Sequence, residues 1–201
     1  TVVTQIVEPI TITATDYLGN DSKEKEIEVL PWKCVEEDVK NGVLTIHSSV
    51  SNLTSGMLDN CSGATSIVIH NNITEIEASI FDSMINLTSF TGPNNGTFFV
   101  DNNVLYKGDG TLVKYPPAKK DNSYTIREGT TTIGSHVFTR NNNIQDITLP
   151  EGFTTIAKGA FDKTHNSSLR IIPNSIVERT TVLSLQENNE KLFNPNEDYV
   201  G

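Results

Sequence analysis

The chain reads Ile126-Arg-Glu-Gly-Thr-Thr-Thr-Ile133-Gly-Ser-His-Val-Phe138 and then, 23 residues later, Leu149-Pro-Glu-Gly-Phe-Thr-Thr-Ile156-Ala-Lys-Gly-Ala-Phe161. The large apolar residues and the Glu-Gly pair occupy the same places in both copies. A fixed period in the twenties is the signature of a solenoid, in which each unit is too short to bury its apolar face alone and must stack on its neighbours. We therefore expect this repeat to set the fold.

The repeat extends in both directions from these two copies. Apolar residues recur at the same offsets in six units, which begin at Ile46, Ile69, Gly92, Ile126, Leu149 and Ile172. The third unit is 34 residues long (126 − 92) instead of 23, so it carries an insertion of 11 residues. The insertion, at about residues 97–122, predicts a hairpin with Val104 and Tyr106 on one strand, Leu112 and Lys114 on the other, and a turn at Gly108-Asp-Gly110.

Each unit contains two kinds of pattern. Residues 146–150 alternate, with Ile147 and Leu149 inward and Thr148 outward, which predicts a strand, and strands stacked unit on unit form a parallel sheet. In the second half of a unit, Ile73, Ile76, Ile80 and Phe81 are spaced for one face of a short helix or 3₁₀ turn. A strand with a turn-and-helix return is the unit of a leucine-rich solenoid.

These residues resemble a known family. The form apolar-x-Ile-Pro-x-Gly-x-x-x-Ile-x-x-x-Ala-Phe-x-x-Cys-x-x-Leu-x-x-Ile is that of BspA-like leucine-rich repeat proteins, and it is matched here by residues 147–161 and by Leu58-Asp-Asn-Cys-Ser-Gly-Ala-Thr-Ser-Ile67. The inserted residues 98–117 also look like that family. The resemblance implies an α/β repeat: a right-handed leucine-rich repeat solenoid with a parallel β-sheet on one face and short helices or turns on the other, preceded by a β-hairpin.

The repeats divide the chain into four parts. Residues 1–31 alternate on either side of a turn-rich segment and predict a β-hairpin, which resembles the closing hairpin of a bacterial immunoglobulin-like domain. It is either a remnant of such a domain or a cover for the first repeat. Residues 32–41 carry Trp32, Val35 and Val39 at helix-like spacing and are expected to be the N-terminal cap. Residues 42–182 form the solenoid, and residues 183–201 a polar C-terminal cap or tail.

The chain has two cysteines, Cys34 and Cys61. Cys61 lies at the repeat position that Met84 occupies in the next unit, so the favoured interpretation is burial as a small hydrophobic residue. A Cys34–Cys61 disulfide that joins the cap to the first repeat is the alternative. A zinc site is not expected, because neither cysteine has a neighbouring Cys or His.

Charge and hydropathy exclude several classes of partner. The formal net charge of −10 argues against nucleic acid and against anionic membranes, both of which require clustered Lys and Arg. No apolar run is long enough to span a bilayer. No leader opens the chain, so we expect any export signal to have been removed or to lie outside this sequence.

The sequence contains no arrangement that predicts catalysis. His47 and His70 share one repeat position and are expected to stack on adjacent strands, but two ligands hold a metal weakly and no third is evident. His136 and His165 are expected to be solvated. Nucleophile elbows, zinc-protease motifs and phosphate loops do not occur. We therefore predict no enzyme activity, no cofactor and no resident metal; a polysaccharide-processing role is a minor alternative.

What the solenoid offers is an outward sheet face with two columns of side chains. The first column is Thr45, Val68, Thr91, Thr125, Thr148 and Ile171, and the second is His47, His70, Pro93, Arg127, Pro150 and Pro173. The candidate binding residues on this face are His47, His70, Thr91, Thr125, Arg127 and Thr148. A plain alternative is a solvated sheet whose threonines serve β-propensity.

Two hypotheses about function follow. The first is a non-catalytic, extracellular or surface-bound binding module, similar in role to BspA-like adhesins and directed at host or bacterial proteins, matrix components or glycans. The second is a structural spacer that displays another domain and has no ligand of its own. In either case we expect a monomer.

Overall fold

The computed structural model describes residues 10–12, 25–27, 32–164 and 169–172. The chain forms two compact units, Thr1–Lys33 and Cys34–Gly201. In the first unit, β1 (Ile10–Ile12) pairs antiparallel with β2 (Lys25–Ile27), as a hairpin requires. The turn between these strands and the predicted tail, residues 183–201, lie outside the described residues.

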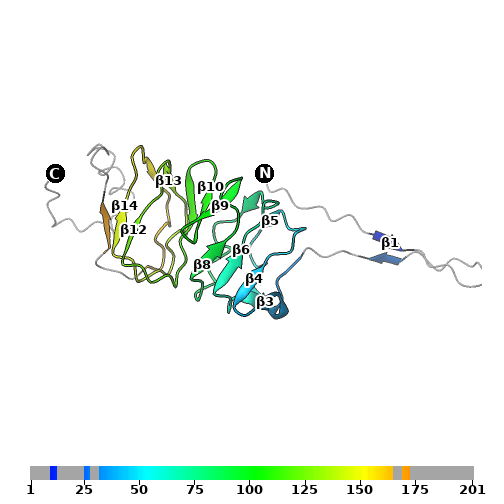
Figure 1. Cartoon of the computed structure of the whole chain (residues 1–201). Helices are drawn as coiled ribbons and strands as arrows, with labels where there is room; N and C mark the ends of the chain where they lie inside the picture. The colour runs from blue at the N-terminus through cyan, green and yellow to red at the C-terminus, as the bar shows by residue number, and fades with distance from the viewer. Residues whose placement is uncertain (1–9, 13–24, 28–31, 165–168, 173–201) are drawn as a thin grey trace, which may run out of the picture. The chain divides into compact units, whose positions relative to one another are not determined.

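The predicted parallel sheet is present, but it is divided in two. In the first sheet β3 (Val39–Lys40) pairs antiparallel with β4 (Val43–Thr45), followed by the parallel strands β6 (Ser66–Val68) and β8 (Ser89–Thr91). The second contains β12 (Ser123–Thr125), β14 (Asp146–Thr148) and β16 (Arg170–Ile172), all parallel. Each three-residue strand of these two sheets buries its central residue and turns its flanking residues outward. Figure 1 shows β4, β6 and β8 side by side, and β12 beside β14. β3 covers the first edge of the first sheet.

The return segments are strands and turns instead of helices. β5 (Asn52–Leu53) pairs parallel with β7 (Glu75–Ile76), and β13 (Thr132–Ile133) pairs with β15 (Thr155–Ile156). The described residues contain no α-helix, and their two helical turns are the 3₁₀ segments η1 (Glu36–Asp38) and η2 (Asp59–Cys61). Of the expected short helices or turns, only turns are present, so the α/β class is not confirmed. Neighbouring units supply backbone partners at strand distance to segments such as Thr132–Ile133, which favour extended structure. The handedness of the solenoid stays a prediction.

The insertion is built into the return sheet. Antiparallel pairs join β9 (Phe98–Asp101) to β10 (Val104–Lys107) and β10 to β11 (Thr111–Lys114), the last about the Gly108–Gly110 turn. β11 then pairs parallel with β13, so the sheet order is β15-β13-β11-β10-β9. Asn102 and Asn103 join β9 to β10 with φ of 49° and 66°, values of a tight type I′ turn that asparagine tolerates.

The core runs between the strand layers and explains why the repeat is so regular. Phe138 and Phe161 occupy equivalent places, and their rings stack with centroids 5.0 Å apart. Gly129 and Gly152 both have a left-handed φ, 82° and 73°, in the turn that follows the strand. The glycine of the recurrent Glu-Gly pair is therefore required by the left-handed backbone conformation of the turn.

The last unit is shifted by one residue from the expected register. Ile171 pairs with Ile147 and is 1% exposed, whereas Ile172 pairs with Thr148 and is 37% exposed. The outward residue of the first column is thus Ile172, and the prediction of Ile171 was wrong. The repeat length here is 24 (170 − 146), because Leu169 and Ile171 are the residues that reach the core.

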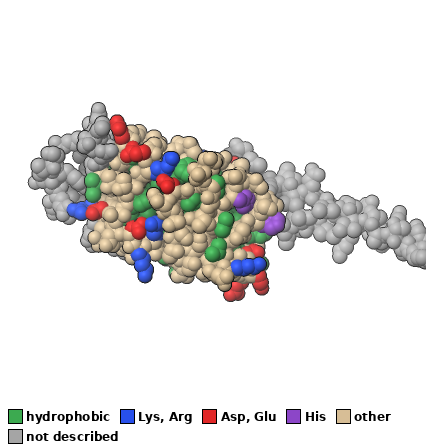
Figure 2. All heavy atoms as spheres, in the orientation of Figure 1, with side chains coloured by type: hydrophobic (Ala, Val, Ile, Leu, Met, Phe, Trp, Pro, Cys, Tyr) green, Lys and Arg blue, Asp and Glu red, His purple; other side chains and the backbone are tan. Residues whose placement is uncertain are grey.

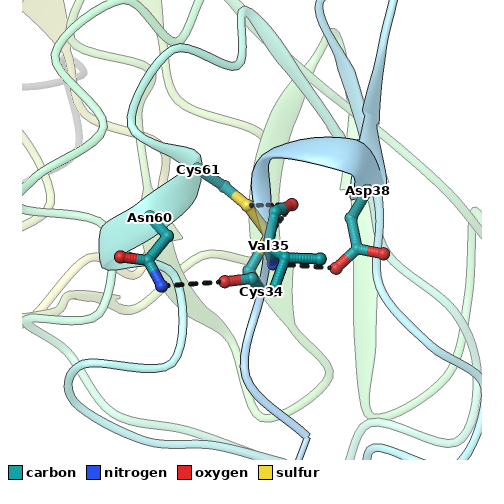
Figure 3. The surroundings of a disulfide bond; sticks show 5 residues. All are labelled: Cys34, Val35, Asp38, Asn60 and Cys61. Atoms are coloured by element: carbon teal, nitrogen blue, oxygen red, sulfur yellow. Dashed lines mark hydrogen bonds between the residues drawn. A yellow bond between two sulfur atoms is a disulfide. The ribbon is translucent and has the colours of Figure 1, made fainter.

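A disulfide closes the start of the solenoid (Figure 3). Cys34 and Cys61 are bonded, with Cα atoms 6.1 Å apart, and the Asn60 side-chain amide donates to the Cys34 carbonyl. Cys61 is buried as expected, but the preference for a free thiol was wrong, because the chain entering the first unit places Cys34 against η2. The helix-like spacing of residues 32–41 yields only the single turn η1, whose Asp38 carboxylate accepts from the Val35 N–H.

Candidate interaction face

The six predicted binding residues all lie at the outward side of the solenoid strands. His47 and His70 follow β4 and β6, and Thr91 ends β8. Thr125 and Thr148 end β12 and β14, and Arg127 follows β12. The structure brings His47, His70 and Thr91 together on the first sheet, and Thr125, Arg127 and Thr148 together on the second. The two groups do not form one row, because β8 and β12 are not paired. The second column is also shorter than expected, since Pro150 is buried and Pro173 lies outside the described residues.

The two histidines are tied into the backbone of the solenoid. His70 Nε2 lies 3.1 Å from the His47 carbonyl oxygen, and His70 Nδ1 accepts from the Asn72 N–H at 3.3 Å. Both ring nitrogens of His70 are therefore used within the chain. His47 Nδ1 contacts the Ser49 hydroxyl at 2.7 Å. Within the described residues, no group of three or more His, Cys, Asp or Glu side chains is placed to hold a metal ion.

Arg127 connects the sheet face to the insertion. Its Nε lies 3.5 Å from Asp101 Oδ2, and its guanidinium carbon lies 5.1 Å from the centre of the Phe99 ring. Phe99 in turn stacks on Tyr106, with ring centroids 5.6 Å apart. Asp101 thus lies beside this face and the buried Phe99 packs beneath Arg127, although the repeat pattern singled out neither residue. The Asp101-Asn-Asn-Val104 sequence could have indicated their position, because it is typical of a two-residue hairpin turn. Such a turn folds β10 back along β9 and brings β9 beside the repeat.

The face is electrostatically mixed. Arg170 donates two hydrogen bonds to the Asp146 carboxylate, at 2.7 and 2.9 Å, across β14 and β16. Figure 2 shows charged side chains of both signs as separate spots among uncharged ones, with histidines close to the end of the solenoid that carries β4. The face therefore offers hydrogen bonds and shape more than a single strong field.

The buried tyrosines behind the face are held neutral. The Tyr106 and Tyr124 hydroxyls share a short hydrogen bond, and burial raises the pKa of both groups. Tyr115 donates to Asp121 Oδ2 at 3.0 Å, and burial again raises the pKa of its hydroxyl. These hydroxyls act as fixed hydrogen-bonding groups and not as bases near neutral pH.

A second polar cluster lies on the return side. Lys114 is 1% exposed, and its Nζ donates to the His136 carbonyl at 2.7 Å and lies 4.0 Å from Asp82 Oδ1. His136 Nδ1 is 3.0 Å from Asp82 Oδ2 and its side chain is 28% exposed, so His136 is partly solvated and has a partner within the chain. His165 lies outside the described residues. The cluster ties the insertion to the units on both sides of it.

A pocket of about 400 Å³ opens where the sheet is divided. Its walls come from the β9–β10 turn, the loop before β12, and β12 itself: Asn102, Asn103, Lys119, Asp121, Ser123, Tyr124 and Thr125. Of these residues only Thr125 was a predicted site residue. The repeat pattern cannot show such a pocket, because it arises from the insertion interrupting the stack.

Comparison with known proteins identifies relatives of the solenoid. A family model described as BspA-type leucine-rich repeat region, in six copies, matches residues 25–108 and 119–190. A leucine-rich cell surface protein from Faecalibacterium prausnitzii is similar in structure, with a TM-score of 0.51 and 24% identity over 66% of this chain and 41% of that one. A leucine-rich repeat protein from Eubacterium ventriosum has a TM-score of 0.55 and 24% identity over 65% of this chain and 37% of that one.

These likenesses establish the fold, and the chain spans about two fifths of the length of each of the two solved proteins. No protein with a curated description matches significantly. In the part of the chain that the structure describes, no helix has the length and hydropathy to cross a bilayer.

Proposed function

Because this chain belongs to the BspA-type leucine-rich repeat family, we propose that its solenoid is a non-catalytic protein-interaction module that binds host or bacterial macromolecules through the sheet face. The observation that carries the proposal is the face itself. Short strands held by backbone ladders present Thr91 on the first sheet and, on the second, Thr125 and Thr148 at one-strand spacing, with Arg127 just after β12. Such a rigid, polar and shallow surface suits an extended macromolecular partner.

We further propose that the module works outside the cell, at a bacterial surface or in secreted form. The Cys34–Cys61 disulfide supports this, because such bonds persist in oxidising compartments. The similar protein from Faecalibacterium prausnitzii is described as a cell surface protein, which is consistent with the same location. Matrix proteins, other surface proteins and glycans are the partner classes to test.

The alternative, a spacer without a ligand, is favoured by one observation. The His70 imidazole and the Arg127 guanidinium already have partners within the chain. In a spacer, these side chains would serve only to stiffen the stack. The two functions differ in whether outward substitutions change binding.

The deciding experiment is a binding array of matrix proteins, bacterial surface proteins and glycans probed with the purified chain. A Thr91→Arg, Arg127→Glu variant adds bulk and reverses charge on the face, and we expect at least a tenfold loss of any specific signal. A Thr54→Arg, Arg140→Glu variant makes the same chemical changes at exposed positions of the return side and serves as the matched control.

The outcomes separate the proposals. A signal lost only by the first variant supports binding through the sheet face. A signal lost by the control alone moves the site to the return side. The absence of any signal from folded protein would contradict the interaction module and favour the spacer.

A further inference from the structure

The edge of β12 is left open by the division of the sheet. The Asp146 N–H donates to the Asn122 carbonyl at 3.1 Å, and the Ile126 N–H donates to the Thr148 carbonyl at 3.0 Å. Backbone groups of a parallel strand point to its two edges in alternation, so Asn122, Tyr124 and Ile126 bond toward β14. The N–H and C=O groups of Ser123 and Thr125 therefore point to the opposite edge.

In the preceding unit, the edge of β8 that corresponds to the open edge of β12 is paired with β6. The Ser89 N–H donates to the Thr65 carbonyl, and the Ile69 N–H donates to the Thr91 carbonyl. If this pattern continued by one unit, β8 would pair with Ser123 and Thr125 of β12. The Phe90 N–H would then donate to the Ser123 carbonyl. Instead the Phe90 N–H donates to the Asn103 carbonyl at 3.0 Å. The turn of the insertion thus takes the place of β12 beside β8.

The space left beside β12 is the pocket of about 400 Å³. One wall is the open strand edge at Ser123 and Thr125. The other wall carries Asn102 and Asn103, exposed residues whose side-chain amides each offer two donor hydrogens and an acceptor oxygen. The pocket therefore has hydrogen-bonding groups on both sides of a gap that a regular stack would fill with a strand.

The lining also indicates what kind of ligand fits. Its two charged side chains, Lys119 and Asp121, are paired with each other, so the pocket carries little net charge. Its one aromatic residue, Tyr124, is 8% exposed and offers little ring surface for stacking. Neither an ionic ligand nor a stacked sugar ring is favoured, whereas backbone amides match the groups that are present.

We propose that this pocket, the strand slot, binds an extended peptide segment of a partner protein as an added strand along β12. The main chain of the peptide would pair with Ser123 and Thr125, and the amides of Asn102 and Asn103 would contact its far edge. Main-chain pairing gives such sites their affinity, and here small or uncharged side chains would be preferred. This inference rests on the proposed interaction function and assigns its partner class.

The slot is short, which limits unwanted pairing. β12 has three residues, and edge strands of this length are poor templates for aggregation. A three-residue pairing alone gives modest affinity. The slot is therefore expected to act together with Arg127 and Thr148 on the adjacent face.

The test is selection from a displayed library of random linear heptapeptides on the whole chain. Thr125→Pro removes an N–H that faces the slot and leaves the Tyr124 N–H facing β14, as an edge strand permits. Thr125→Val keeps the N–H, replaces the hydroxyl with a methyl group, and is the matched control. We expect the selected peptides to bind Thr125→Pro at least tenfold more weakly than Thr125→Val, which keeps the N–H that faces the slot.

A second measurement does not depend on how the variant folds. N-methylation scanning of a selected peptide against the unchanged chain should lower affinity at least tenfold at alternate residues and little at those between. Uniform effects along the peptide would overturn the proposal, as would failure to enrich any peptide over the Thr125→Pro variant. Binding of a neutral glycan at the slot without a peptide hit would assign it to sugars instead.

The two levels of proposal can fail separately. A partner whose binding is lost with Thr91→Arg, Arg127→Glu but kept with Thr125→Pro would refute the slot and leave the interaction function intact. If neither the array nor the library yields a ligand, both proposals are contradicted.

Discussion

At the scale of single residues, Lys114 shows how a charged side chain can belong to the core. It occupies the last position of β11, where alternation turns it inward beside Leu112. Its ammonium is held by the His136 carbonyl and lies near Asp82, so three segments far apart in sequence are joined at one point. A buried charge of this kind costs free energy unless its partners compensate.

The burial of Lys114 predicts how stability depends on pH. Burial lowers its pKa from 10.5 to about 8, so the unfolded chain binds more protons than the folded chain between those values. The free energy of unfolding should therefore rise with pH, by about 2 kcal/mol between pH 7 and pH 9.5. Below about pH 7 both states hold the proton and this contribution is flat. Urea denaturation at a series of pH values measures the rise.

Lys114→Met should abolish this rise, and Lys158→Met, at an exposed position, should keep it. The range stops at pH 9.5 because unfolded tyrosines ionise near pH 10 while the buried ones stay neutral, which lowers stability again. An equal rise in Lys114→Met would show that another group titrates.

At the scale of elements, the return strands show why periodicity alone did not decide between helix and strand. Ile73, Ile80 and Phe81 are buried as the helical spacing required. The backbone between them nevertheless pairs with the neighbouring unit, as in the Asn52–Glu75 and Leu53–Ile76 pairs. Spacing reports which side chains face inward, whereas the hydrogen-bond partner of the backbone is chosen by the stack.

The register of the return sheet gives a packing prediction. Ile133 is fully buried between Leu112 of β11 and Ile156 of β15. Ile133→Ala should lower the free energy of unfolding by roughly 2–5 kcal/mol, because it removes buried methylenes and leaves a cavity. Thr132→Ala, one residue earlier and partly exposed, should change it by less than about 0.5 kcal/mol. Equal costs in urea denaturation would mean that the register is wrong.

At the scale of the whole molecule, the solenoid is built from contacts between neighbouring units. The disulfide acts on the first units only, closing a loop of 27 residues in sequence separation. A bond of this kind contributes about 3–4 kcal/mol by restricting the unfolded chain. Each unit of a stack is stabilised mainly by its immediate neighbours. Removal of the disulfide should therefore destabilise the first units, which it closes, more than the later ones.

Removal of the disulfide therefore predicts a gradient along the solenoid. In a Cys34→Ala, Cys61→Ala variant, amide hydrogen exchange should accelerate at least tenfold in β4 and β6 and stay nearly unchanged in β12 and β14. Hydrogen-exchange mass spectrometry of the two proteins measures this, with β14 as the internal control. Uniform acceleration across all strands would show that the solenoid unfolds as one cooperative unit.

The comparison of sequence and structure shows what each determines. The spacing of apolar residues and the Glu-Gly turns determined by themselves the repeat, its inward residues and the outward positions of Thr91, Thr125 and Thr148, because side-chain burial follows local periodicity. Only the tertiary structure decided which backbone groups pair. The return strands, the bonded cysteines, the shifted Ile172 and the open edge of β12 all depend on which segment lies beside which, and no local pattern contains that information.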